Sequence, residues 1–190
     1  PDSVVAISSR LENFRQKSED YKNKIMKDNK SHYFSKIIKA MTPVEIPEPN
    51  PEIINKYNNK DSIKHRLIYV NRVNHYFDNI DFKDENLLRT SIIPLKIDQY
   101  FKKIVIPDPD SIIKACFNLI ERTRYNKYVY RYVINYLLKK FEKSGDMPKD
   151  KVFIAIADNY YLKGKTPWVN KKFLNLLAER VKLMKPLQTG

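Results

Sequence analysis

Glycine is scarce in this sequence: Gly145, Gly164 and Gly190 are the only three in 190 residues. Phosphate-binding P-loops, the dinucleotide fingerprint and the nucleophile elbow each require clustered glycines at backbone positions closed to other residues. All three motifs are therefore excluded. Tight two-residue hairpins also depend on glycine, which disfavours an all-β architecture.

Cysteine and long apolar runs are also lacking. Cys116 is the only cysteine, which excludes a disulfide framework, a CxxC redox pair and a cysteine-rich zinc site within this chain. No apolar run approaches the roughly 20 residues that span a bilayer, and no signal peptide is recognisable. The chain starts at Pro1 and not at Met, so we expect an excised or processed piece, whose missing targeting signals say little about location.

What the sequence does contain fits a folded domain: 42% hydrophobic, 31% charged and 12% aromatic residues. The net charge of +14 invites a nucleic-acid or polyanion-binding interpretation, which we keep as the alternative. However, the excess of positive charge is spread along the chain and is highest in residues 151–190, which contain eight Lys or Arg and two Asp or Glu. This distribution favours a basic face that docks an acidic protein partner, and we expect no nucleic acid.

Residues 1–41 predict a long heptad helix followed by a short one. The seam of the long helix has alternating spacings of three and four residues, at Val4, Ile7, Leu11, Phe14, Ser18, Tyr21 and Ile25. The flanking e and g positions hold Arg10, Arg15, Lys17, Lys22 and Lys24. A parallel pair of copies would oppose like charges, so packing on another segment is favoured. Ser31 is the candidate cap of the short helix.

Residues 42–51 form a proline-rich strap, because four prolines in ten residues fit neither a helix nor a central strand. Two alternatives stay open: an extended connector at a boundary, or an ordered strap across a helical surface.

Residues 60–184 predict a helical body. Helix starts fall near residues 109, 126, 148 and 170, and spacings of about 20 residues with short joints indicate antiparallel helix pairs. The 126–142 helix is apolar over most of its circumference, which predicts that neighbours enclose it. We therefore expect an all-α fold of about seven helices in a single domain, 1–190, with pairs stacked as in a helical-repeat superhelix.

Candidate catalytic and metal-binding residues are few. Cys116 lies in the apolar stripe of its helix without a histidine or acid at i±3 or i±4, as expected for a small buried hydrophobe. His65 and His75 cannot share one helix face, and His75 with Asp78 would need further zinc ligands. We expect no catalytic, cofactor-binding or metal-binding residues.

The acidic run Asp78, Asp81, Asp84 and Glu85 has the acidic density of a calcium loop but neither its glycine nor its spacing. Asp84 is instead expected to cap a short helix at 85–88. The basic and aromatic run from Arg122 to Tyr132 resembles a nucleic-acid surface, yet its tyrosines fall at core spacings.

Several motifs resemble a known family. The run from His75 to Thr90 is similar to the signature "HFFDNIDFSDERLLRTP". Asp108–Ser111 resembles its "HPDSI", Asn126–Val133 resembles "NKEVFKYV", and Tyr160–Trp168 resembles "YYLTGKADWV". Tyr21–Ile25 and Glu45–Pro49 also resemble its N-terminal part. The family consists of helical domains of unknown function in envelope proteins of Gram-negative bacteria, placed before a thioredoxin-like domain of the TlpA/peroxiredoxin type.

This resemblance implies a periplasmic, secreted or lipid-anchored setting. It implies that residues 185–190 begin a linker to a thioredoxin-like domain of the same chain, absent here, which would carry the redox CxxC. We therefore expect a non-catalytic accessory module of an envelope thiol–disulfide oxidoreductase that positions the redox domain or binds clients. It supplies no catalytic residues, and the oligomeric state stays open.

Overall fold

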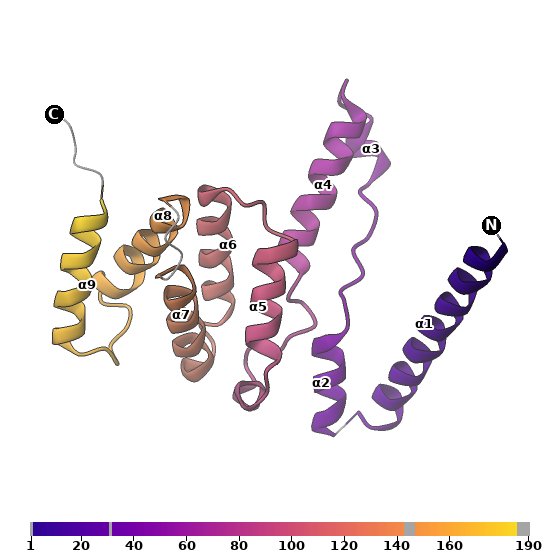
Figure 1. Ribbon diagram of the computed structural model, residues 1–190, viewed down its shortest axis with the longest axis horizontal. Helices are drawn as coiled ribbons and strands as arrows, with labels where there is room; N and C mark the ends of the chain where they lie inside the picture. Colours follow the sequence, from indigo (N-terminus) through magenta and orange to yellow (C-terminus); the bar gives the residue numbers. More distant parts are fainter. Residues whose placement is uncertain (1, 31, 143–146, 186–190) are drawn as a thin grey trace. The chain divides into compact units, whose positions relative to one another are not determined.

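A computed structural model describes residues 2–30, 32–142 and 147–185 (Figure 1). All regular structure in these ranges is helical, which confirms the predicted all-α class. The described ranges contain nine α-helices, a short 3₁₀ helix and a π-helical segment. Eight of these α-helices have nine or more residues, close to the expected number of about seven, and the other is the four-residue α3, which is too short to show a hydrophobic period.

The helices follow one another along the chain without any strand in the described ranges. Their bounds are α1 Asp2–Asp28, α2 Tyr33–Met41, α3 Pro51–Ile54, α4 Lys60–His75, η1 Glu85–Arg89, α5 Ile92–Lys103, α6 Pro109–Arg122, α7 Lys127–Glu142, α8 Met147–Ile156, η2 Ala157–Leu162 and α9 Lys171–Met184.

Side-chain caps fix several helix starts where the sequence predicts them. Asp108 accepts a hydrogen bond from the Ser111 amide at 3.0 Å, and Asn170 accepts one from the Phe173 amide at 2.8 Å. Asp84 likewise caps η1, as expected from the acidic run. Ser31, Gly145 and the linker residues 186–190 lie outside the described residues.

The chain divides into two compact units, with boundaries at Glu45/Ile46 and around residues 76–80. The first unit contains α1, α2 and the short segment 76–80. Within it the Asn79 side chain donates to the Thr42 carbonyl at 3.1 Å. Ala40, Phe77 and Ile80 are its buried apolar side chains.

The second unit contains residues 46–75 and 81–190. Its strap segment is held on α4, because Glu48 pairs with Lys64 at 3.2 Å and Pro49 is buried. The core lies where α6, α7 and α8 pack together, with α9 packing on α8 and η2. Fully buried side chains from these helices include Cys116, Ile120, Val133, Ile134, Leu137, Phe153 and Ile156.

The end of the 148–162 helix departs from α geometry. After α8 the chain continues as the π-helical segment η2 and ends at Gly164, which has φ of 72° in the left-handed region. Glycine suits this helix stop, since it adopts positive φ without strain. A π turn holds more residues than an α turn, and both Tyr160 and Tyr161 of this segment are buried.

Candidate functional site

An open groove of about 690 Å³ lies between α7 and α9 in the second unit. One wall comes from α7, the other from α9, and the floor and end come from η2 and the loop before α9. Large aromatic and aliphatic side chains dominate it: Tyr132, Tyr136, Tyr161, Trp168, Phe173 and Leu176. An apolar groove with a few polar groups is the usual form of a binding site.

The α7 wall is built from two tyrosines one turn apart. The rings of Tyr132 and Tyr136 stack with centroids 5.9 Å apart and planes at 18°. Burial, then a hydrogen bond to Asp98 and the charge of that carboxylate, raises the pKa of Tyr136. The neutral form of the Tyr136 phenol is therefore favoured over the phenolate.

The floor is fixed by a hydrogen bond from the π-helical segment. The hydroxyl of Tyr161 donates to Oδ1 of Asn135 at 2.6 Å, and its ring lies 6.1 Å from that of Phe173. Tyr161 is buried, so it sets the depth of the groove and contributes little exposed surface.

An ion pair joins the two walls. Arg180 of α9 binds the Glu142 carboxylate of α7 at 2.5 Å and reaches the Glu142 carbonyl at 3.5 Å. The Arg180 guanidinium also lies 5.2 Å from the Phe153 ring centroid. The planar guanidinium of Arg180 thus contacts both Glu142 and the Phe153 ring, and it links α9 to α7.

The other end of the groove is formed by Trp168. Its ring meets Tyr130 edge to face at 5.9 Å, and the Arg131 guanidinium lies over it at 5.9 Å. Arg131 and Lys139 are exposed on α7. The groove thus has an aromatic interior and a rim with more positive than negative charge, three cations against Glu142.

The structure corrects the prediction that neighbours enclose the 126–142 helix. Its buried stripe consists of Val129, Val133, Ile134, Leu137, Leu138 and Phe141. Tyr132 and Tyr136 lie instead in the groove wall, and Tyr128 is 51% exposed. The tyrosines of the basic run therefore do not form the core, although their spacing suggested it.

The α9 wall contains both buried and exposed apolar side chains. Leu177 and Val181 are buried, but Phe173 and Leu176 are 43% and 58% exposed and line the groove. The apolar face of α9 is wider than the stripe it buries. That excess width was the available sequence signal for a site, together with Trp168 just before the helix.

Cys116 lies in the α6 core and has no exposed surface. Burial raises the pKa of the Cys116 thiol well above its usual value, with Lys140 opposing weakly. A neutral thiol without solvent access is a poor nucleophile.

Carboxylates of the acidic run accept hydrogen bonds from backbone amides of their own segment. Asp81 accepts from the Lys83 amide at 3.0 Å and Asp84 accepts from the Asn86 amide at 3.1 Å. No cluster of three or more His, Cys, Asp or Glu suited to a metal ion occurs in the described ranges. In the same ranges, no helix is both long and apolar enough to cross a membrane.

Comparison with known proteins gives one match. Neither the curated proteins nor the solved structures contain a match to this chain. A family model described as a domain of unknown function, DUF5106, matches residues 13–185. That match includes the groove and every helix except the first half of α1. The chain belongs to the DUF5106 family.

Proposed function

We propose that this chain is a non-catalytic helical module that binds an apolar, acid-flanked segment of a protein partner in the groove between α7 and α9. The observation that carries the proposal is an aromatic groove with a positively charged rim, built on packed helices. Large aromatic side chains and arginine dominate the energetics of protein interfaces. Arg131 and Lys139 at the rim would attract a partner with Asp or Glu beside its apolar residues.

The surroundings of the groove support a binding site in preference to a catalytic site. Its walls are held by the Arg180–Glu142 pair and the Tyr161–Asn135 hydrogen bond, both made within the module. A preformed surface reduces the entropy cost of binding. The only thiol of the chain, Cys116, is fully buried away from the groove wall.

The finer proposal concerns the setting. The motif runs at residues 75–90, 108–111, 126–133 and 160–168 support a module of an envelope thiol–disulfide oxidoreductase, in which the partner is a thioredoxin-like domain of the same protein or a client of it. The parent reading frame after residue 190 tests this setting. A CxxC domain there would support it, and any other continuation would contradict it.

The groove itself can be tested with the intrinsic fluorescence of Trp168, the only tryptophan of the chain. We expect a peptide with leucine and phenylalanine between aspartates to change the Trp168 emission on binding. Leu176→Ser should weaken that binding about fivefold or more, since it removes exposed apolar contact area from the wall. The lysine-flanked version of the peptide should bind more weakly.

Leu183→Ser is the matched control, because Leu183 is on the same helix, is 86% exposed and does not line the groove. Equal effects of the two leucine substitutions would contradict the proposal. A duplex DNA or RNA titration at low salt tests the alternative. Tight, steeply salt-dependent binding to nucleic acid with no peptide binding would replace the proposal by the polyanion-binding one.

A further inference from the structure

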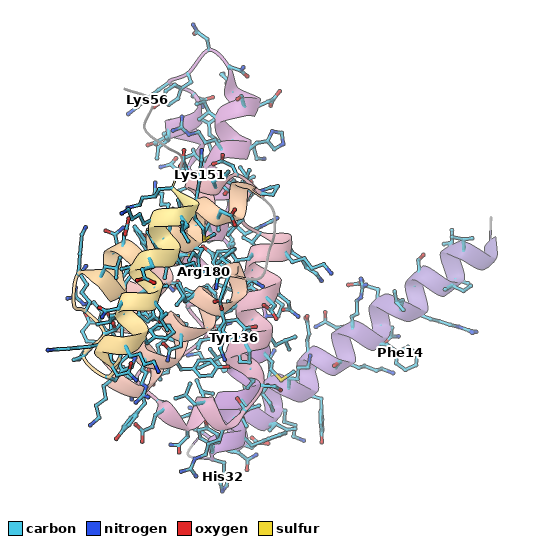
Figure 2. All side chains as sticks on the ribbon, turned by 60° about the vertical axis from the view of Figure 1, so that its left-hand side comes forward. Phe14, His32, Lys56, Tyr136, Lys151 and Arg180 are labelled. Carbon is cyan, nitrogen blue, oxygen red and sulfur yellow. The ribbon has the colours of Figure 1, made fainter. Side chains whose placement is uncertain are left out.

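Helix α1 carries an apolar stripe that is exposed along most of its length. Every described side chain from Val4 to Lys24 is exposed, and partial burial begins only at Ile25. The large side chains of the stripe are 52% to 72% exposed, at Val4, Ile7, Leu11, Phe14 and Tyr21. Figure 2 shows the Phe14 ring standing off the α1 ribbon. In the first unit, α1 packs on α2.

A stripe of this kind requires a partner. Most helical stability in proteins comes from packing an amphipathic face, and large exposed apolar patches mark interaction sites. The spacing of the stripe follows the heptad pattern, in which side chains of one helix insert into hollows of another. A hollow of about 310 Å³ lies beside Ser18, bordered by Leu11, Phe14 and Lys22. The small Ser18 leaves room there for a large side chain of an opposing helix.

The charges beside the stripe exclude a second copy as that helix. Positions e and g hold Arg15 and Lys22 on one side and Arg10, Lys17 and Lys24 on the other. A parallel pair opposes g to e, and an antiparallel pair opposes e to e and g to g. Both arrangements place cations opposite cations, and this charge repulsion disfavours the pairing of two copies.

An anionic membrane is also a poor match for α1. The helix contains six cationic and five acidic residues. Glu12, Glu19 and Asp20 lie among the residues opposite the stripe, whereas surface-binding helices carry mostly Lys and Arg on that face. The cations of α1 are concentrated beside the stripe, where they would meet the flanks of a partner helix.

We propose that the α1 stripe docks an amphipathic helix of another protein that carries Asp or Glu at the positions flanking its own apolar seam. The contact is a two-stranded, coiled-coil pairing in which the acidic flanks of the partner meet Arg10, Arg15, Lys17, Lys22 and Lys24. It does not involve the groove between α7 and α9 and does not depend on the function proposed for it.

The experiment uses the whole chain and two helical peptides. Both peptides have leucine at positions a and d, and they carry either glutamate or lysine at e and g. We expect the glutamate peptide to bind and the lysine peptide not to bind, by fluorescence anisotropy of the labelled peptide. Phe14→Asp should weaken the binding about tenfold or more. Asn23→Asp, at the opposite f position, adds the same charge and should leave the affinity within about twofold.

Charge reversal makes the test specific. The double variant Arg15→Glu and Lys22→Glu should lose affinity for the glutamate peptide and gain affinity for the lysine peptide. Equal binding of both peptides, or equal effects of Phe14→Asp and Asn23→Asp, would overturn the proposal. So would binding to phosphatidylserine vesicles without peptide binding, or sedimentation that shows a dimer disrupted by Phe14→Asp.

Discussion

Several tyrosine side chains have a raised pKa in the folded protein. Burial raises the pKa of Tyr136, Tyr160 and Tyr161 far above the ordinary value of about 10. Neighbouring charges raise the pKa values further, from Asp98 at Tyr136 and from Glu142 at Tyr161. In each case the folded protein holds the neutral phenol and resists its ionisation.

These shifts predict how stability depends on pH. Because the folded pKa values exceed the unfolded ones, the stabilisation is complete below about pH 10 and is lost as the pH rises above it. Absorbance at 295 nm should show a group of tyrosines that ionise only as the chain unfolds. Asp98→Asn should shift part of this group to lower pH, while Asp110→Asn, on the exposed first turn of α6, should not. A single titration at the ordinary pKa would contradict the burial of these rings.

Single residues also show how far sequence reasoning extends. The burial of Cys116 was predictable, because its helix has a narrow apolar stripe with polar flanks. The placement of Tyr132 and Phe173 was not, since core and groove positions share the same helical spacing. They line a groove because the described helices of the second unit leave this side of α7 and α9 open, and helical spacing within one segment does not report what lies across from it.

At the scale of one element, α9 depends on its cap. Asn170 binds the Phe173 amide and so satisfies one of the donors left free in the first turn. Asn170→Ala should reduce the free energy of unfolding by about 1 kcal/mol. Urea unfolding measures this as a lower midpoint at an unchanged slope.

Asn175→Ala provides the control, because Asn175 is exposed within α9 and the substitution raises helix propensity. It should leave the midpoint unchanged or raise it slightly. If the two asparagine substitutions cost the same, the cap contributes no stability.

Helix boundaries were largely predictable, and the exceptions have physical causes. Asp108 with Pro109, Asn126 and Asn170 mark starts because short polar side chains accept bonds from the first amides. The four-residue α3 was missed because it is shorter than one period of the pattern. The π geometry of η2 was missed because local helix propensity does not distinguish a π turn from an α turn.

At the scale of the whole molecule, the two units differ in how much of their surface is buried. Deletion of residues 1–24 removes side chains that are exposed wherever they are described. We expect the thermal midpoint to change by less than about 2 °C, since little apolar burial is lost.

Deletion from Asn170 onward is the contrasting truncation. It removes Leu177 and Val181, which are 5% and 2% exposed, and opens the core beneath the groove. The midpoint should fall by about 10 °C or more. Similar losses in the two truncations would show that α1 is packed in solution and would argue against a free stripe.

The all-α class was predictable at this scale. The sequence has few glycines, which disfavours tight β-hairpins, and many of its segments show the hydrophobic spacing of a helix. The division at Glu45/Ile46 falls within the proline-rich segment that was the candidate boundary. The single-domain prediction and the superhelical stacking stay predictions. The groove was the least predictable feature, because it forms only when α7, η2 and α9 come together.

The π segment lets the chain after α8 hold an extra residue without losing its helical register. A π turn holds about one residue more than an α turn, so η2 is equivalent to a single-residue insertion absorbed in place. Removing one residue, for example Asn159, would return the segment to α geometry and leave the residues after it in register with those before it. Without the π turn, the extra residue would rotate everything after it by about 100°, which would turn Tyr161 away from Asn135 and present another face of α9 to α7. The two walls of the groove can therefore survive a change of one codon in the chain between them.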